Sequence, residues 1–284
     1  MPQRIVIVGG GVGGTITANL LARSLLPTEA EITLIESSGY HVYMPGWLYL
    51  PFNHASPSSE QIVRRERDLL DKHVHHVIGE VDGIDAANRE LHVRYSEGRD
   101  EIVGTGGALE AIYAYDYLVL ATGARLVPSD LEGLSGTEDR WHHFYSAEGA
   151  MQLRHALREF AGGRIVITVG GIPYRCPPAP LEFSFLLDEW LRKQGLREKT
   201  EIEYLFPLPR VFPIESVAEV VTPLLEERGI GYRVFFNAEK VDTEQRVISS
   251  LEGEEFAYDL LVVVPPHRGA KFVEEAGLGD AQGW

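Results

Sequence analysis

Cysteine is almost absent from this chain, which has one residue of this type, Cys176, among 284. A single cysteine excludes a disulfide within the chain, so its thiol is either a small buried side chain or a reactive group. Long apolar runs are lacking as well. No stretch of about 20 apolar residues occurs, so the sequence predicts no membrane-spanning helix. No secretory leader precedes the first glycines. We therefore expect a cytoplasmic protein.

Positive charge is also scarce. Lysine and arginine contribute 26 residues against 42 aspartates and glutamates, which gives a formal net charge of −16. Such a surface argues against nonspecific binding to nucleic acid or anionic lipid. The chain is 44% hydrophobic and 24% charged, which is typical of a globular protein with a sizeable core. Its length predicts one or two domains.

Strand and helix patterns alternate along the chain. Apolar residues at i, i+3, i+4 and i+7 predict helices around residues 18–25, 153–160, 183–191 and 217–225, each with one apolar stripe towards a sheet. Between them lie short apolar runs that do not alternate with polar residues, as is typical of strands buried on both faces. Alternation of this kind predicts an α/β fold. The runs are Ile5–Val8, Ile32–Ile35, Ile165–Val169 and Leu260–Val264.

A glycine-rich turn follows the first predicted strand. Gly9, Gly11 and Gly14 form the pattern G-x-G-x-x-G, which allows a tight turn, a close approach of backbone amides to a pyrophosphate, and close packing of helix on strand. Glu36 ends the second strand, about 20 residues later, where an acid accepts hydrogen bonds from a ribose. This acid disfavours the 2′-phosphate of NADP. The turn predicts a dinucleotide site, and a turn without a ligand is the alternative.

Two further segments favour FAD over NAD as the dinucleotide. Ala121, Thr122 and Gly123 end a predicted buried strand, and this Ala-Thr-Gly resembles the strand-end motif of the two-dinucleotide-domain flavoprotein superfamily, which includes glutathione reductase. Pro45 lies in the sequence Tyr-Met-Pro-Gly, which resembles the loop that lies against the flavin in that superfamily. For this second segment, a surface turn is the alternative.

The second strand–helix unit departs from the dinucleotide pattern. Gly170 and Gly171 follow the strand at 165–169, but the later glycines are replaced. Prolines occur where amides would face a pyrophosphate, and proline has no N–H to donate. We therefore expect that this unit does not bind NAD(P)H in the usual way, so the flavin exchanges electrons with another molecule.

The single cysteine lies in this altered segment. Cys176 comes just before a helix that is predicted to start near Leu181, and Arg175 precedes it. A helix N-terminus and a neighbouring cation both favour thiolate, which is the reactive form. The sequence therefore predicts a reactive Cys176, and a small buried side chain is the alternative.

The segment Arg175–Glu182, Arg-Cys-Pro-Pro-Ala-Pro-Leu-Glu, resembles the cysteine loop of sulfide:quinone oxidoreductases and of the flavoprotein subunit of flavocytochrome c sulfide dehydrogenase. The likeness covers nearly the whole chain, including the glycine turn, the Tyr-Met-Pro loop, the Ala-Thr-Gly motif and the strand end Val263–His267. It implies FAD as cofactor, sulfide as electron donor and quinone as acceptor. It also implies that Cys176 carries sulfane sulfur at a cysteine–flavin site.

Three departures from this family are visible. No second cysteine follows Cys176, and the third cysteine that many members have near the Ala-Thr-Gly motif is absent. The family's later Gly-Asp motif and membrane-facing tail do not occur before Trp284, so the chain resembles a C-terminally truncated member. Peripheral contact with the inner membrane would depend on the missing segment. A homo-oligomer remains open.

Together these patterns predict two Rossmann-like dinucleotide-binding domains of the glutathione-reductase type. We expect an FAD-binding domain at 1–127 with an antiparallel β insertion at about 74–116. A second Rossmann-like domain at 128–264 is expected to open on a linker at 128–136. Residues 265–284 are expected to return in part to the first domain.

Histidines give one further candidate. His267 ends the last buried strand, where ligand sites form in α/β proteins, and we predict that it handles a proton. His73, His75 and His76 lack an acid or cysteine at ligand spacing, so no metal site is predicted there. The leading hypothesis is a sulfide:quinone oxidoreductase-like enzyme. The alternatives are an NAD(P)H-dependent flavin disulfide-type reductase or NADH dehydrogenase, and a non-catalytic, flavin-free relative.

Overall fold

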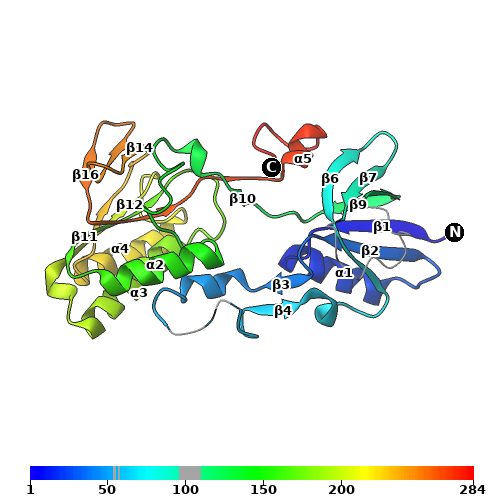
Figure 1. The fold of residues 1–284 in the computed structure, drawn as a ribbon, viewed down its shortest axis with the longest axis horizontal. Helices are drawn as coiled ribbons and strands as arrows, with labels where there is room; N and C mark the ends of the chain where they lie inside the picture. Colours follow the sequence, from blue (N-terminus) through cyan, green and yellow to red (C-terminus); the bar gives the residue numbers. More distant parts are fainter. Residues whose placement is uncertain (54–55, 57, 96–109) are drawn as a thin grey trace. The chain divides into compact units, whose positions relative to one another are not determined.

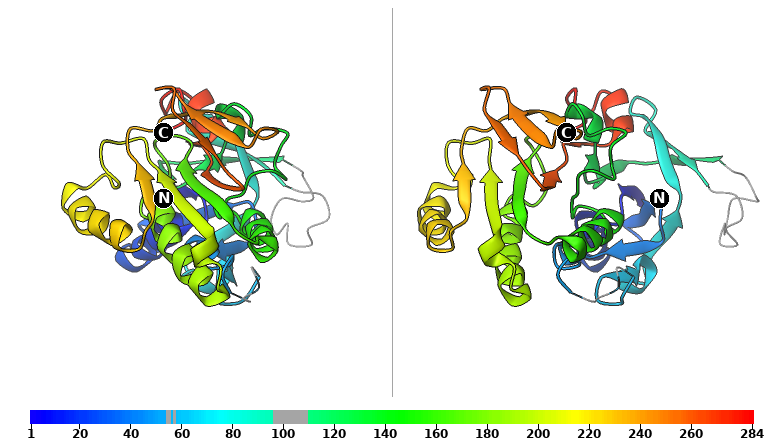
Figure 2. Two further views of the ribbon diagram at one scale, coloured as in Figure 1. Left: turned by 90° about the vertical axis from the view of Figure 1, so that its left-hand side faces the viewer. Right: turned by 60° about the vertical axis from the view of Figure 1, so that its left-hand side comes forward.

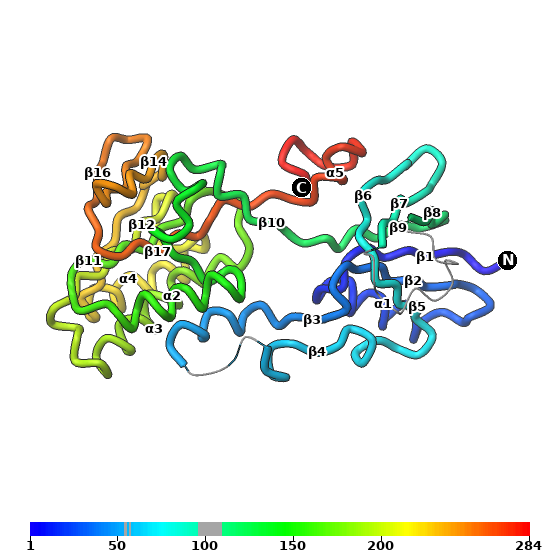
Figure 3. Tube along the Cα trace, in the orientation of Figure 1, coloured from blue at the N-terminus to red at the C-terminus, as the bar shows by residue number. Residues whose placement is uncertain are grey.

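The computed structural model describes residues 1–53, 56, 58–95 and 110–284. These residues form two compact units, and the chain passes between the units near residues 43, 59, 125 and 267 (Figure 3). The first unit comprises Met1–Tyr43, Glu60–Arg125 and Arg268–Trp284, and the second comprises Met44–Ser59 and Leu126–His267.

A parallel sheet in the order β5-β2-β1-β9 forms the centre of the first unit. Both faces of this sheet are covered by other elements, which explains the continuous apolar runs in its central strands. Helix α1 (Val12–Ser24) packs Ala18 and Ala22 against one face, while strands β6 and β7 lie over the other (Figure 1). The strands of the sheet are β1 (Gln3–Val8), β2 (Ala30–Glu36), β5 (Val74–Ile78) and β9 (Tyr117–Leu120).

The antiparallel insertion is a three-stranded sheet, and it is shorter than the sequence predicts. Val74–Ile78 pairs in parallel with β2, so this segment belongs to the main sheet, and the antiparallel part begins at Glu80. The prediction that it starts at about residue 74 is wrong, because Val74 packs beside Ile32 in the core under α1. The inserted strands are β6 (Glu80–Asp85), β7 (Glu90–Arg94) and β8 (Glu110–Ala114).

Four smaller elements complete the first unit. The antiparallel pair β3 and β4 lies between β2 and β5 in sequence, and the C-terminal helix α5 packs Phe272 against the core between sheet and insertion. The elements are β3 (Tyr40–Val42), β4 (Val63–Arg65), the 3-10 helix η2 (Glu66–Leu69) and α5 (Lys271–Glu275).

The second unit repeats this plan with a parallel sheet in the order β13-β12-β11-β17. Helices lie on one side of the sheet and a three-stranded antiparallel sheet on the other (Figure 2). The sheet strands are β11 (Gly163–Val169), β12 (Thr200–Leu205), β13 (Gly231–Arg233) and β17 (Leu260–Val264); the antiparallel strands are β14 (Ala238–Asp242), β15 (Val247–Ser250) and β16 (Glu255–Ala257); the helices are α2 (Ala147–Glu159), α3 (Ala179–Gln194) and α4 (Glu215–Glu227).

Short elements lie at the margins of the second unit and where the chain crosses between the units. They are the 3-10 helices η1 (Met44–Leu48), η3 (Pro128–Asp130) and η4 (Arg197–Lys199), and the two-residue strands β10 (Arg125–Leu126) and β18 (His267–Arg268).

One sequence prediction about the second unit is wrong, and another is correct only in part. The segment 128–136 is not a linker, because it belongs to the second unit, and Leu131 and Leu134 are buried in the core under the antiparallel sheet. In α4 the predicted stripe is buried only in part: Leu225 is buried together with Ala218, but Val220 and Leu224 are exposed. Helix α4 lies beside the edge strand β13, which covers only a narrow part of its surface.

The predicted α/β class with two Rossmann-like units is confirmed by two parallel sheets of matching strand order. Among the described residues, no helix combines the length and the apolar character that a bilayer crossing requires.

Candidate functional site

The turn between β1 and α1 is three residues long and is shaped by its glycines. Gly9 has a φ of +110°, and a Cβ there would lie 2.2 Å from the backbone oxygen of Ala121. A Cβ on Gly14 would lie 1.8 Å from the oxygen of Gly9. The first and third glycines of the motif are therefore required by packing, because strand end, turn and helix touch through their backbones.

Gly11 differs from the other two motif glycines. A Cβ at this position would meet no atom within 4 Å, and its backbone is extended, with a φ of −83°. Gly11 caps α1 without a side-chain hydrogen bond, so the first amides of the helix face open space. Free amides at a helix N-terminus bind phosphate groups, aided by the helix dipole. The turn therefore fits the pyrophosphate of a dinucleotide such as FAD.

The Ala-Thr-Gly motif ends β9 next to this turn. Ala121 donates its N–H to the oxygen of Val8 at 2.8 Å, and its own oxygen lies against Gly9. Thr122 and Gly123 follow directly, with Gly123 at a φ of +66°. The structure thus brings the motif beside the glycine turn, although the two are more than 100 residues apart. That these residues contact the cofactor stays a prediction.

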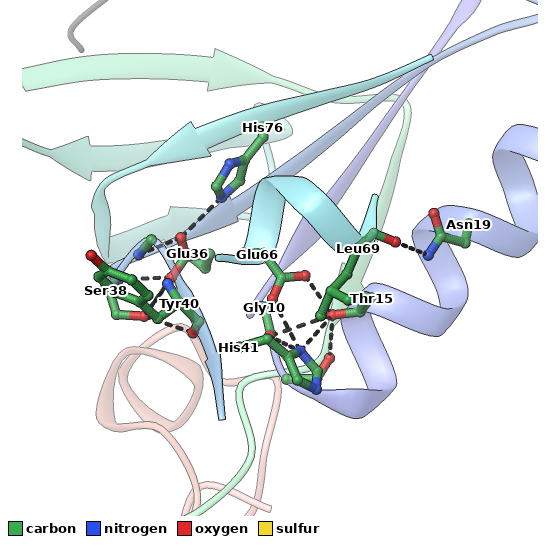
Figure 4. A network of polar contacts seen from close by, with 12 residues as sticks. Gly10, Thr15, Asn19, Glu36, Ser38, Tyr40, His41, Glu66, Leu69 and His76 are labelled. Atoms are coloured by element: carbon green, nitrogen blue, oxygen red, sulfur yellow. Dashed lines mark hydrogen bonds and ion pairs between the residues drawn. The ribbon is translucent and has the colours of Figure 1, made fainter. Parts of the chain in front are cut away.

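Glu36 reaches the end of β2, as predicted, but its carboxylate already accepts four hydrogen bonds (Figure 4). Oε1 accepts from Gly39 N at 2.7 Å and lies 2.9 Å from His76 Nε2, while Oε2 accepts from Ser38 N at 2.7 Å and Ser38 Oγ at 3.0 Å. Burial raises the pKa of Glu36, but the hydrogen bonds from His76, Ser38 and Gly39 outweigh it, so the pKa lies below its usual range.

This arrangement limits how Glu36 can bind a ribose. A carboxylate offers about four acceptor positions, and all of them are used. A ribose hydroxyl must replace one donor, and Ser38 Oγ is the movable one because it also reaches the oxygen of Tyr40 at 3.0 Å. The ribose role of Glu36 stays a prediction. His76, where the sequence predicted only the absence of a metal site, is a hydrogen-bond partner of this acid.

A second polar network lies beneath the glycine turn, and sequence reasoning missed it (Figure 4). The fully buried Glu66 accepts a hydrogen bond from Thr15 Oγ1 at 2.6 Å. His41 Nδ1 lies 3.0 Å from Glu66 Oε2 and 3.0 Å from the oxygen of Gly10. Nδ1 also lies 3.2 Å from Thr15 Oγ1, whose hydrogen goes to Glu66. Its remaining neighbours are acceptors, so this nitrogen carries the proton. These side chains come from α1, β3 and η2, and together they hold the peptide of Gly10 in place. The three elements are far apart in the sequence, so no local pattern predicts the network.

Pro45 is exposed on η1, a segment that groups with the second unit. Within that unit, η1 packs against α2. The predicted contact of Pro45 with the flavin stays a prediction.

In the second unit, a nine-residue loop replaces the short dinucleotide turn. Strand β11 ends at Val169, and α3 begins only at Ala179, with Pro178 as its N-cap. A Cβ on Gly171 would lie 3.6 Å from Pro266, which packs against the turn. The start of α3 has few free amides, because residues 177, 178 and 180 are prolines and Ala179 N already donates to the oxygen of Cys176. This loop therefore does not form the pyrophosphate cradle that the first unit has.

Cys176 is an exposed residue of this loop, and its backbone has a φ of +56°. Its surroundings in the fold oppose ionisation of the thiol, although the adjacent helix start and Arg175 favour it. That Cys176 is reactive stays a prediction. Desolvation of the sulfur by surrounding protein, together with the charge of Glu182, raises the pKa of the thiol above its usual value. The hydrogen bond from Ala179 N and the charge of Arg175 act in the opposite direction but do not outweigh these effects.

We expect Cys176 to react slowly with iodoacetamide near neutral pH, because only the thiolate is nucleophilic. The midpoint of its pH–rate profile should lie above that of a free cysteine peptide. In Glu182→Gln the midpoint should fall, because a negative charge that opposes ionisation is removed. Mass spectrometry of the singly alkylated chain measures both profiles. A wild-type midpoint below that of the peptide would contradict the raised pKa.

Arg175 is held in place beside the thiol by groups that carry no charge. Its Nη2 donates to the oxygen of Tyr145 at 2.6 Å, and its Nη1 to Met44 Sδ at 3.1 Å. The guanidinium carbon lies 5.9 Å from the ring centroid of Trp47 and 5.6 Å from that of Tyr145, which are cation–π distances. Within the described ranges, no carboxylate forms an ion pair with Arg175.

His267 packs against the same tyrosine. Its ring lies edge-on to Tyr145 at 5.2 Å, and its Nδ1 donates to the oxygen of Pro265 at 2.7 Å. Its Nε2 is buried and has no hydrogen-bond partner. Burial lowers the pKa of His267 to about 4, so the ring is neutral at neutral pH and Nε2 is a free acceptor. Burial likewise lowers the pKa of the neighbouring His143 to about 4.

The chain matches the model of the pyridine nucleotide-disulphide oxidoreductase family over residues 3–265. It is 26% identical over 283 residues to the mitochondrial sulfide:quinone oxidoreductase of Dictyostelium discoideum, covering 98% of this chain and 59% of that protein. The chain thus spans less than two thirds of this relative's length. A type II NADH:quinone oxidoreductase of Staphylococcus aureus is 24% identical over 297 residues, covering 99% of this chain and 69% of that protein.

Among solved structures, the sulfide:quinone oxidoreductase of Aquifex aeolicus superposes with a TM-score of 0.77 at 25% identity, covering 97% of this chain and 61% of that chain. The similarity extends over nearly all of this chain.

Proposed function

Because this chain belongs to the pyridine nucleotide-disulphide oxidoreductase family, whose members use FAD, we propose that it oxidises sulfide and passes the electrons to a quinone. Its relatives include enzymes that are named for this reaction. The proposal places the cofactor on the first unit, at the turn of Gly9, Gly11 and Gly14. It places the sulfur chemistry on the second unit, at Cys176.

The observation that carries the proposal is the loop at residues 170–178. The relatives include both sulfide and NADH oxidising enzymes, so the family alone leaves the electron donor open. A nicotinamide dinucleotide needs amides for its pyrophosphate, and this loop offers prolines instead. The same loop presents an exposed thiol. The electron donor is therefore a molecule that reacts with a thiol.

Each residue of the site has a chemical role in this proposal. Overall, hydrogen sulfide, the Cys176 thiol and a quinone give a Cys176 persulfide and a quinol, so two electrons and two protons leave the sulfur atoms for the quinone. FAD supplies the two-electron relay when it is bound. Cys176 Sγ forms the new S–S bond, and it needs to lose its proton to do so. Nε2 of His267 is a free, neutral acceptor and takes up a proton that leaves sulfur.

The proposal is tested by the visible spectrum of the FAD-loaded protein under anaerobic conditions. Sulfide should bleach the flavin band. In Cys176→Ser the bleaching rate should fall by about 10³-fold or more, the scale on which loss of a nucleophile slows an enzyme. Dithionite should bleach both proteins equally, which shows that the variant still holds reducible FAD.

Other outcomes would favour the two alternatives. Bleaching by NADH but not by sulfide would indicate an NADH dehydrogenase, and it would contradict the argument from the loop. A folded protein that takes up no FAD would indicate a flavin-free relative. If sulfide bleached the flavin of Cys176→Ser as fast as that of the wild type, the thiol would have no role in the reaction.

A further inference from the structure

Arg175 carries a positive charge that the described part of the protein does not neutralise. Its guanidinium donates hydrogen bonds to a backbone oxygen and a thioether, and its neighbours are the rings of Trp47 and Tyr145. Burial lowers the pKa of this guanidinium, yet arginine keeps its proton in proteins. A partly buried charge without a counterion is costly, and an anion from solution would lower that cost.

The adjacent thiol does not provide this counterion. Desolvation and Glu182 keep the pKa of Cys176 raised, so the group is neutral near pH 7. Tyr145 is neutral as well, because burial raises its pKa. Glu182 is exposed and forms no ion pair with Arg175. The cation therefore lies beside two uncharged groups, Cys176 and Tyr145, and the nearby carboxylate of Glu182 does not pair with it.

A second, independent observation points to a ligand at the same place. The side chain of His267 is only 4% exposed, and its Nε2 has no partner among the described residues. The ring of His267 lies 5.2 Å from that of Tyr145, whose other neighbour is the guanidinium of Arg175 at 5.6 Å. An unpaired cation and an unpaired acceptor thus both pack against Tyr145. Together they match a small anion that also has one hydrogen to donate.

We propose that Arg175 and His267 form an anion site beside Cys176, and that its ligand is hydrosulfide. Arg175 attracts the negative sulfur, and the S–H of the anion donates to Nε2 of His267. The identification of the anion as hydrosulfide rests on the proposed function, whereas the anion site itself does not. The site concentrates the ionised form of the substrate at a thiol that is itself uncharged.

The site is tested by alkylating Cys176 with iodoacetate, which is an anion, and with iodoacetamide, which is neutral. Both reagents attack the same thiolate, so the ratio of the two rates cancels any change in the pKa of the thiol. Relative to wild type, Arg175→Gln should lower the iodoacetate-to-iodoacetamide ratio about five- to tenfold, the effect of one unit charge at close range. Arg175→Lys should retain most of the ratio, and Glu182→Gln should raise it.

The wild-type protein provides a measurement that needs no variant. Added salt should lower its ratio, because a partly exposed charge is screened. A ratio that changes neither with salt nor in Arg175→Gln would overturn the anion site. The assay uses no sulfide and no flavin reduction, so it can succeed where the proposed function fails. If the anion site holds and the proposed function holds, Arg175→Gln should also raise the sulfide concentration for half-maximal flavin bleaching by about tenfold.

Discussion

Gly11→Ala should deprive the protein of FAD without disturbing its fold. The backbone of Gly11 suits alanine, and the added methyl group would meet no protein atom within 4 Å. It would instead occupy the open space in front of the first amides of α1. Hydrogen bonds to a charged group contribute about 1.5–3 kcal/mol each, so losing one weakens FAD binding by about 10- to 100-fold. Quenching of flavin fluorescence during titration of the apoprotein measures this affinity.

Two neighbouring glycines provide matched controls. A Cβ on Gly13 would have only Ala121 Cβ nearby, at 3.8 Å, so Gly13→Ala should bind FAD normally. Gly14→Ala should lower the melting temperature of the apoprotein, because its Cβ would lie 1.8 Å from the oxygen of Gly9. Two results would contradict the assignment of the glycine turn as the pyrophosphate site. One is unchanged FAD affinity in Gly11→Ala, and the other is an equal loss of FAD affinity in Gly13→Ala.

Asp188→Asn should be the most destabilising single change of a charged residue in the second unit. Asp188 lies on α3 and is fully buried. Its carboxylate accepts from Arg192 Nε at 3.0 Å, Arg197 Nε at 2.6 Å and Arg228 Nη1 at 3.1 Å, which joins α3 to η4 and to the end of α4. Breaking a buried ion pair by removing one partner costs about 3–5 kcal/mol, because the opposite charge is left uncompensated.

The matched control is the next residue on the same helix. Glu189 is exposed and pairs with Lys193 at 3.1 Å, and such a pair contributes about 0.3–0.5 kcal/mol. Glu189→Gln should therefore leave the unfolding midpoint in urea nearly unchanged, while Asp188→Asn should lower it clearly. Equal midpoints for the two variants would show that the cluster does not stabilise the unit.

The effect of Asp188 also has a predicted pH dependence. Burial raises the pKa of Asp188, but the hydrogen bonds from the three arginines outweigh burial and hold the pKa below its usual range. A carboxyl with a depressed pKa stabilises the folded state above its unfolded pKa, and this stabilisation is lost as the pH falls through the folded pKa. The difference between wild type and Asp188→Asn should thus be full at neutral pH and shrink in strongly acidic solution.

The sequence by itself determined the first glycine turn and the class of the fold. Gly9, Gly11 and Gly14 act over a few consecutive residues, so their spacing alone defines the geometry of turn and helix. The apolar runs likewise predicted the parallel strands, because burial on both faces leaves a local signature. The prolines around Cys176 showed in the same way that the second unit lacks a dinucleotide turn.

Only the tertiary structure decided the state of the side chains at these places. His76 pairs with Glu36, and Thr15 and His41 with Glu66, across separations that follow no local period. The helix start and the cation next to Cys176 favour thiolate, whereas desolvation in the folded protein and the charge of Glu182 raise the pKa of the thiol. The hydrogen bonds and the burial of a side chain depend on which segments, distant in the sequence, pack around it. A local sequence pattern contains information only about residues that are close in the sequence.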